Sequence, residues 1–270
     1  MDLITVDFET YYDKDFSLRK VTTEAYIRDP QFEVIGVGVK VNDGQTEWAS
    51  GTHEQIKSYL HTFDWADAML LCHNTMFDGA ILAWIFDVRP RVLADTLCIA
   101  RALHGVEVGG SLHALTQRYN LGTKGTEVLD AKDKHRLDFT PEELGRYGDY
   151  CINDVELTYK LFMRMAKGFP RQEMRIIDMT LRMFTEPMLD LDIGLLRQHL
   201  EDTQQIKKDL IESSGVTREQ LMSNPKFAEL LVSMNVEPPM KTSLTTGKET
   251  YAFAKNDEAF KALQEHDDPR

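Results

Sequence analysis

Two acidic residues at the end of the first predicted strand constrain the fold more than any other feature of the chain. Residues 3–9 read Leu-Ile-Thr-Val-Asp-Phe-Glu, a β-branched and aromatic run that predicts a strand. Because side chains alternate faces along a strand, Asp7 and Glu9 leave the same face, about 7 Å apart at the backbone. The apolar residues before them predict a central strand, and its carboxyl end is where α/β proteins usually bind ligands.

Two further motifs contribute one acid each. Asp78 follows an apolar stretch at 68–72 that predicts a buried strand, and it opens a predicted helix with Asn74 four residues earlier. Asp154 lies four residues after Tyr150 in a long predicted helix, so these two side chains share a face. Taken singly, each motif also fits an ordinary role, such as helix capping, a first-turn acid or a solvated helical acid.

The four carboxylates together indicate a metal site. Acids gathered at one point repel one another unless cations lie between them. Oxygen ligands favour Mg²⁺ or Mn²⁺, and pairs of such ions cleave phosphodiesters. We therefore predict two divalent cations held by Asp7, Glu9, Asp78 and Asp154.

The order of predicted elements is typical of an α/β fold with a mixed central sheet flanked by helices. After the first strand we expect strands at 32–41, 45–49, 68–72 and 92–94. We expect helices at 53–63, 77–86, 111–119 and 141–166, and one that follows the strand at 92–94 and ends at 104. Gly168-Phe169-Pro170 breaks this pattern, which predicts one domain at 1–168 and a second, mainly helical segment at 169–270. In that segment we expect helices at 171–186 and 193–213, a further helix from Asn224, and a polar loop at 241–248.

Composition narrows the class of protein. The 270 residues are 42% hydrophobic and 28% charged, which is ordinary for a globular protein. Three cysteines, an odd number, argue against a disulfide framework and suit a reducing cytoplasm. No signal peptide or membrane span is expected. A net charge of −13 is unusual for a nucleic-acid binder, but metal ions reverse the sign at a site, and a tethered domain needs little affinity of its own.

The three motifs resemble those of DEDD-type 3′→5′ exonucleases, in the subgroup with Tyr in the third motif. The matching residues are, in chain order, Asp7, Glu9 and Thr10; His73, Asn74 and Asp78; and Tyr150 and Asp154. The resemblance covers residues 1–166 and implies a ribonuclease-H-like fold. It also implies catalytic roles for the four acids and Tyr150, with Asp7, Glu9 and Asp154 on one ion and Asp78 reaching the second.

The same resemblance suggests substrate contacts. Thr10 and Asn74 are candidates for contacts to the terminal nucleotide and its phosphate, and His73 is expected to line the site. Leu112 resembles a residue that helps seat the terminal nucleotide, and Leu112 and Phe8 are expected to wedge or stack on the last bases. Tyr150 is expected to orient the attacking water by a hydrogen bond.

The second segment resembles the stretch that joins the exonuclease to the thumb in family A DNA polymerases, especially phage-type ones. The residues that carry this resemblance are 187–192, Asn224-Pro225-Lys226, Lys241 and Thr245-Thr246-Gly247-Lys248. No palm or fingers motif is present, so we expect those regions in a longer parent chain from a bacteriophage or bacterium, located in the cytoplasm of the cell or host. The expected substrate is single-stranded DNA or a frayed primer 3′ end, trimmed in proofreading.

Two alternatives stay open at this point. The first is a DEDD-type exoribonuclease, since the acids contact phosphate and not sugar. The second is a catalytically silent domain that docks nucleic acid or braces a polymerase. The presence of all four acids and Tyr150 argues against the second alternative.

Overall fold

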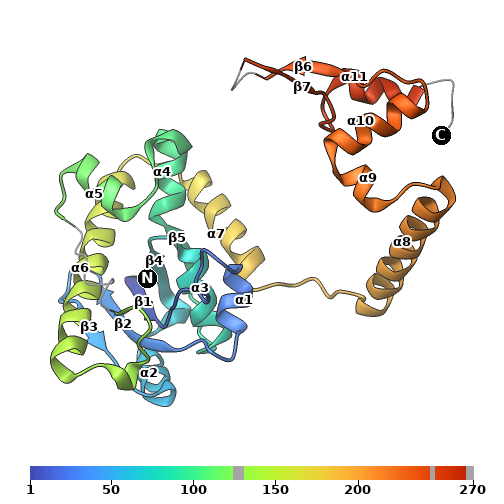
Figure 1. Ribbon diagram of the computed structural model, residues 1–270. Coiled ribbons are helices and arrows are strands. Elements are labelled where there is room, and N and C mark those ends of the chain that lie inside the picture. Colours follow the sequence, from blue (N-terminus) through green and yellow to red (C-terminus); the bar gives the residue numbers. More distant parts are fainter. Residues whose placement is uncertain (124–130, 244–246, 266–270) are drawn as a thin grey trace. The chain divides into compact units, whose positions relative to one another are not determined.

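The structure, a computed structural model, describes residues 1–123, 131–243 and 247–265, and its elements are shown in Figure 1. Contacts divide the chain into two compact units, Met1–Met188 and Leu189–Arg270, which are described separately. Within the described residues, no helix combines the length and apolar character needed to cross a membrane.

A five-stranded sheet forms the centre of the first unit. Its strands are β1 (Asp2–Thr10), β2 (Val34–Val41), β3 (Glu47–Ala49), β4 (Ala68–Cys72) and β5 (Val92–Asp95), in the order β3-β2-β1-β4-β5. β1 pairs antiparallel with β2 and parallel with β4, so the predicted mixed sheet is confirmed, with β1 in the middle. The acids of β1 therefore lie at the centre of the sheet, close to elements on both sides.

Helices surround this sheet. They are α1 (Thr23–Arg28), α2 (His53–Leu60), α3 (Thr75–Trp84), α4 (Thr96–His104), α5 (Leu112–Tyr119), α6 (Pro141–Met165) and α7 (Arg171–Thr185), with short 3₁₀ helices η1 (Trp65–Asp67), η2 (Val106–Val108) and η4 (Arg136–Asp138). α6 packs over β1, β2 and β3, whereas α3 packs on β1, β4, β5 and α7 (Figure 1). Sequence analysis predicted these helices except α1 and the 3₁₀ turns, which are too short to show a periodic pattern.

Helix α6 is fixed at its start and along its length. Thr140 and Glu143 form a capping box, with Pro141 in the first helical turn, as the sequence predicts. Further along, Glu156 accepts hydrogen bonds from Lys40 Nζ at 2.7 Å and from the Thr46 hydroxyl. Lys40 is buried on β2, so this ion pair ties α6 to the sheet.

Replacing Glu156 by Gln should lower the free energy of unfolding by about 2 kcal/mol at pH 7, because the buried Lys40 ammonium loses its counter-charge. Burial alone would raise the pKa of Glu156, but the hydrogen bonds from Lys40 and Thr46 hold it below its ordinary value of 4.5. The stabilisation is therefore present above pH 4.5 and lost as the pH falls through the lowered pKa. Urea melts of both proteins at several pH values should give free energies of unfolding that become equal in acid. A difference in free energy that does not change with pH would contradict the ion-pair account.

The first unit extends past the predicted boundary at residue 168. α7 packs on α3 and β5, and the division by contacts falls after Met188. Asp178 of α7 accepts the backbone N–H of Leu93 at 2.8 Å, and Trp84 Nε1 donates to the Thr185 carbonyl at 2.8 Å. Pro170 is the N-cap of α7. The Gly-Phe-Pro break thus begins a helix of the same compact unit.

The second unit is mainly helical, as predicted, with a small hairpin. Its elements are α8 (Ile193–Ser214), α9 (Arg218–Met222), α10 (Asn224–Ser233), β6 (Met240–Thr242), β7 (Glu249–Tyr251), α11 (Glu258–Lys261) and η5 (Ala262–Glu265). The predicted polar loop at 241–248 is wrong at its start, since Lys241 and Thr242 pair with β7; residues 244–246 lie outside the described residues. Lys241 also pairs with both carboxylate oxygens of Asp257 at 2.7 Å.

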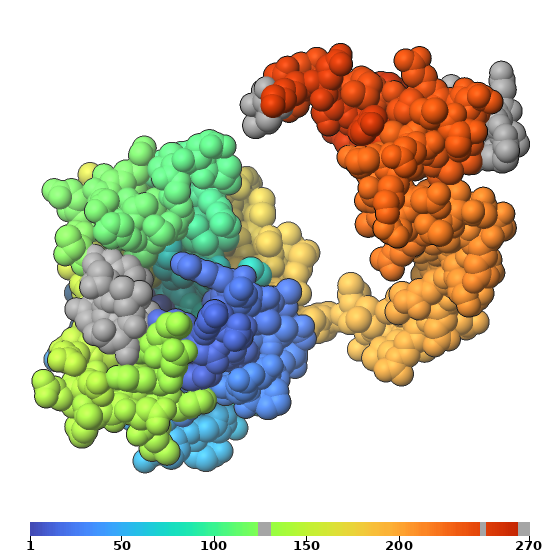
Figure 2. All heavy atoms as spheres, in the orientation of Figure 1, coloured from blue at the N-terminus to red at the C-terminus, as the bar shows by residue number. Residues whose placement is uncertain are grey.

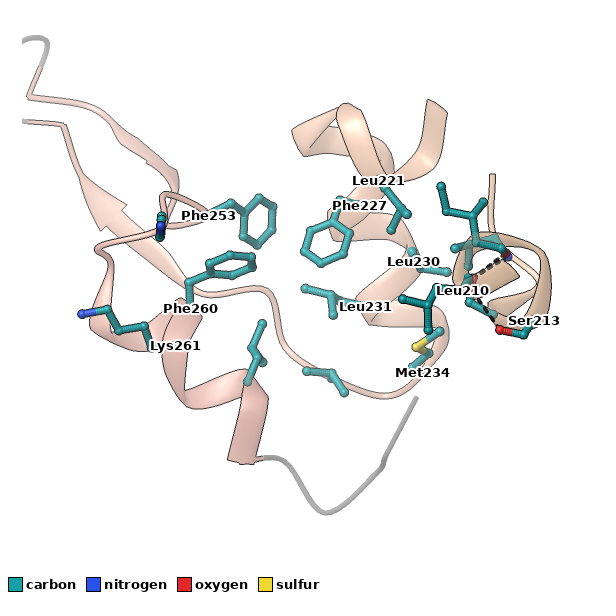
Figure 3. Close-up of a pocket in the computed structure, with 16 residues that line it drawn as sticks. Leu210, Ser213, Leu221, Phe227, Leu230, Leu231, Met234, Phe253, Phe260 and Lys261 are labelled. Atoms are coloured by element: carbon teal, nitrogen blue, oxygen red, sulfur yellow. Dashed lines mark hydrogen bonds between the residues drawn. The ribbon is translucent and has the colours of Figure 1, made fainter. Parts of the chain in front are cut away.

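A cavity of about 860 Å³ lies within the second unit and is lined by residues between 210 and 263 (Figure 3). Its walls are mostly aliphatic and aromatic, and the rings of Phe227 and Phe253 lie 5.0 Å apart at one side. None of the predicted site residues lines it.

Candidate active site

The end of β1 presents two carboxylates to α6. One ligand atom each of Asp7, Glu9 and Cys151 lie within 4.8 Å of one another. The Cys151 thiol donates to the Asp7 carbonyl oxygen at 3.3 Å and lies 3.7 Å from Asp7 Oδ2. Gly38 of β2 makes this approach possible, because a Cβ there would lie 2.9 Å from the Cys151 sulfur. The structure therefore brings β1 and α6 together at the acids, as the motifs predict.

Asp78 joins the same group from the first turn of α3. Its Oδ1 accepts the backbone N–H of Phe8 at 3.1 Å, which links the second motif to the first. Its side chain is buried, and burial, followed by the charge of Asp7, raises the pKa of Asp78 well above its usual range. The charge of Asp7 thus acts on Asp78 in the direction that the predicted repulsion between acids requires.

Tyr150 and Asp154 complete the predicted set. Both are buried on α6, at 5% and 3% exposure, and they hydrogen-bond to each other. Burial, followed by the charges of Asp154, Glu9 and Asp7, raises the pKa of Tyr150 above its ordinary value of 10.0. At neutral pH its hydroxyl is therefore protonated and can donate a hydrogen bond. Of the five predicted catalytic residues, Asp7 and Glu9 lie in one close group, and electrostatic interactions link Asp78 to Asp7 and Tyr150 to Asp154, Glu9 and Asp7.

Three residues near the acids were missed by sequence reasoning. Tyr147 hydrogen-bonds to Glu9, and burial and then that carboxylate raise the pKa of Tyr147. Cys151 lies beside Asp7 and Glu9, although the cysteines indicate only a chain without disulfides when the sequence is taken alone. Asp95 is 1% exposed at the end of β5 and accepts the N–H groups of Asn74 at 3.1 Å and Leu97 at 2.8 Å. Helical spacing from the third motif would have indicated the first two, and the carboxyl end of a predicted strand would have indicated Asp95.

Three predicted substrate contacts lie at the ends of strands near the acids. The Thr10 hydroxyl is 3.0 Å from that of Tyr26. Asn74 is the N-cap of α3 in the left-handed conformation, with φ 78°, and its side chain makes no capping hydrogen bond, so the alternative role of a side-chain cap is wrong. His73 Nδ1 lies 2.8 Å from the Thr96 hydroxyl, and its Nε2 lies 2.8 Å from the Gly110 carbonyl oxygen. His73 thereby links the start of α4 to the residues that precede α5.

Two predicted base contacts have buried side chains. Phe8 is 5% exposed and stacks on Phe86, with ring centroids 5.8 Å apart. Since strand residues alternate, its ring points into the core, away from the face that carries the acids, so the expected stacking of Phe8 on a base is wrong. Leu112, at the start of α5, is also 5% exposed and packs in the cluster that includes Leu115 and Leu157. Its burial leaves little apolar surface for a base to contact.

A segment from the second half of the unit runs beside the end of β1. Asp133 N donates to the Tyr12 carbonyl at 2.9 Å, and the His135 ring stacks on Tyr11 with centroids 3.8 Å apart. Figure 2 shows these two parts side by side on the visible face, the N-terminal residues in blue and the segment that leads into α6 in yellow-green. Aromatic side chains therefore flank the strand that carries the acids.

The comparison with protein families agrees with this geometry. Residues 2–169 match the model of a family described as 3′–5′ exonuclease. The chain belongs to this 3′–5′ exonuclease family. The matched range contains every predicted site residue. No curated protein sequence matches the exonuclease at a significant level.

Solved structures share its fold at low sequence identity. RNase D of Trypanosoma brucei is 12% identical, with a TM-score of 0.53, covering 70% of this chain and 68% of that one. The same enzyme in complex with RNA U12 is 13% identical, with a TM-score of 0.50 and coverage of 70% and 66%. NrnC of Brucella melitensis with bound Mg²⁺ is 15% identical, with a TM-score of 0.47 and coverage of 70% and 89%. The likeness to RNase D confirms the predicted ribonuclease-H-like fold.

Membership of this family implies use of a divalent metal ion, and the residues present fit one. The carboxylates of Asp7 and Glu9 supply closely spaced oxygen donors on one face of β1. Burial, and after it the charge of Asp7, raises the pKa of Asp78, and a cation between these acids would offset the part due to charge. Oxygen donors of this kind suit Mg²⁺ or Mn²⁺.

Proposed function

We propose that this exonuclease removes nucleoside 5′-monophosphates one at a time from the 3′ end of DNA, as the proofreading part of a family A DNA polymerase. The convergence of four carboxylates and one tyrosine from β1, α3 and α6 carries the proposal for hydrolysis. The resemblance of the second unit to a polymerase thumb supports DNA as the substrate. The palm and fingers regions of the parent chain would then supply most of the affinity for DNA.

In this proposal the acids divide between two cations. Asp7, Glu9 and Asp154 would hold one ion, and Asp7 and Asp78 would hold the other. When bound, the cations supply a hydroxide from water near neutral pH and stabilise the departing 3′ oxygen. Burial of Asp78 and Asp154 keeps bulk water from competing for these carboxylates.

Tyr150 and Glu9 act on the attacking water. Burial is the largest cause of the raised pKa of Tyr150, and it persists when cations offset the charges of the acids. Its hydroxyl therefore keeps its proton and donates to the water oxygen. Glu9 accepts a proton of the same water in a hydrogen bond, and Tyr147 holds the Glu9 carboxylate in position. Thr10 and Asn74 are positioned to contact the terminal nucleotide and its phosphate.

Replacing Tyr150 by Phe should reduce the cleavage rate by about 10- to 100-fold without abolishing cleavage. A hydrogen bond to a charged or developing charged group contributes about 1.5–3 kcal/mol, and 1.4 kcal/mol corresponds to tenfold. Single-turnover rates on a 5′-labelled oligonucleotide measure the effect. Complete loss of cleavage in a folded Tyr150→Phe protein would show that the hydroxyl does more than orient water.

The proposed substrate is tested with matched DNA and RNA oligonucleotides of one sequence, labelled at the 5′ end. Each is incubated with the purified chain in Mg²⁺, in Mn²⁺ and in EDTA, beside the Asp7→Ala variant. We expect a metal-dependent ladder that shortens from the 3′ end, faster on DNA than on RNA, and absent in the variant. Faster cleavage of RNA would favour the exoribonuclease alternative, for which the fold shared with RNase D leaves room. Intact oligonucleotides in every lane would mean either that the chain needs the palm and fingers regions to hold DNA or that it is a silent docking domain.

A further inference from the structure

A thiol lies among the proposed metal ligands. Cys151 is completely buried, and its sulfur is within 4.8 Å of a ligand oxygen of Asp7 and of Glu9. Within the described parts of the chain, these three residues are the one set of at least three acidic, histidine or cysteine side chains whose donor atoms approach so closely. The catalytic proposal above assigns the thiol no role.

The sulfur is held in place from two sides. It donates to the backbone carbonyl of Asp7 on β1, and Gly38 of β2 lies directly beneath it, with no room for a Cβ. Cys151 therefore does not need to move far from its place on α6 to face a cation bound by the β1 carboxylates.

The distances suit a small tetrahedral ion with mixed ligands. Zinc binds sulfur at about 2.3 Å and carboxylate oxygen at about 2.0–2.2 Å, so its ligand atoms lie about 3.5 Å from one another. The three donor atoms of Asp7, Glu9 and Cys151 lie within 4.8 Å of one another, which exceeds the spacing around zinc by about 1 Å at most. Rotation of the two carboxylate side chains can remove this difference. A hard ion such as Mg²⁺ prefers oxygen and leaves the thiol aside, whereas a thiophilic ion recruits it.

We propose that Asp7, Glu9 and Cys151 form a second mode of metal binding, in which a thiophilic divalent cation such as Zn²⁺ is bound by two carboxylates and one thiolate. The S–H bond breaks, the proton passes to water, and a sulfur–metal bond replaces the hydrogen bond to the Asp7 carbonyl. The ion bound in this way occupies Asp7 and Glu9 and excludes the catalytic cation. Zn²⁺ thus inhibits cleavage by competing with Mg²⁺, an inference that rests on the proposed function.

The test uses Cd²⁺ alone as a spectroscopic probe of thiolate binding. The purified chain without other metals is titrated with Cd²⁺ while ultraviolet absorption and heat are recorded. We expect a cadmium–thiolate charge-transfer band that saturates at one equivalent. Cys151→Ser should lack the band and bind Cd²⁺ about tenfold or more weakly, since even outer partners of metal ligands contribute 10- to 100-fold. Absence of the band in the wild type, or its persistence in Cys151→Ser, overturns the proposal.

Cys98→Ser is the matched control. The Cys98 sulfur also lies near a carboxylate, 3.3 Å from Asp95 Oδ2, but it belongs to no group of three ligands. This variant should keep the band, and loss of the band would place the bound ion at Cys98 instead. If Cys151→Ser does not fold, Asp7→Asn tests the same site with the thiol kept. It should bind Cd²⁺ about tenfold or more weakly, and unchanged affinity would contradict a three-ligand site.

A cleavage assay on the same preparation separates the two proposals. Cleavage in Mg²⁺ without a cadmium–thiolate band would leave the exonuclease proposal standing and remove the thiol site. A cadmium–thiolate band without cleavage in Mg²⁺ would support the thiol site and contradict the exonuclease proposal. Zn²⁺ added to the Mg²⁺ reaction should inhibit the wild type and Cys98→Ser at equal concentrations, and excess Mg²⁺ should restore the rate.

Discussion

Replacing Asp7 by Ala should reduce cleavage of a 3′ end by about 10³-fold or more while leaving the protein folded. Asp7 is the acid assigned to both cations, and metal ions contribute several kcal/mol of transition-state stabilisation, at 1.4 kcal/mol per tenfold. Single-turnover cleavage of a 5′-labelled DNA oligonucleotide in Mg²⁺ measures the loss. A variant that cleaves at the wild-type rate would remove Asp7 from the active site.

The same variant should melt in EDTA at a temperature no lower than the wild type. The charge of Asp7 helps to raise the pKa of Asp78, so Asp78 favours the folded state in its protonated form and loses that stabilisation as the pH rises. Removing Asp7 lessens this loss at neutral pH. Mg²⁺ should raise the melting temperature of the wild type but not of Asp7→Ala, because only the wild type binds it tightly.

Asp43→Ala is the matched control for both measurements. Asp43 is an exposed acid in the turn that follows β2, so its removal changes the net charge equally without touching the site. It should cleave and melt like the wild type. Equal loss of activity in Asp43→Ala would mean that overall charge, and not the position of Asp7, sets the rate.

The proposed catalytic set can be read from the sequence because it depends on local periodicity. Asp7 and Glu9 share a face through the two-residue repeat of a strand, and Tyr150 and Asp154 share one through the helical repeat. These relations hold in whatever way the elements pack. The strand at 68–72 and the helix that opens near Asp78 were also visible locally, from an apolar run and the residues that end it.

Contacts that depend on packing could not be predicted in the same way. Helical spacing relates Tyr147 and Cys151 to the third motif, but it does not show how near they come to the β1 carboxylates, because that depends on how closely the helix approaches Gly38. The extension of the compact unit past residue 168 has a related cause. Gly and Pro indicate a break in a helix, but whether α7 stays with the first unit depends on partners such as Trp84, far away in the sequence.

The alternation of side chains along β1 already excludes the expected stacking of Phe8 on a base. The alternation that unites Asp7 and Glu9 requires the residue between them to point the other way. Phe8 accordingly packs on Phe86 in the core beneath α3. Phe8→Ala should therefore lower the free energy of unfolding by about 3–5 kcal/mol, the usual cost of removing a buried aromatic side chain. Urea or guanidinium melts measure the loss.

Phe8→Leu separates packing from substrate contact. Leucine fills much of the same volume, so it should cost far less stability than alanine. At a temperature where all variants are folded, Phe8→Ala should lose much less cleavage activity than Asp7→Ala, because the backbone N–H of residue 8 still reaches Asp78. A Phe8→Ala protein as stable as the wild type but unable to bind single-stranded DNA would restore the stacking role and contradict the core position. These results would assign activity to Asp7 and stability to Phe8, two adjacent residues of one strand.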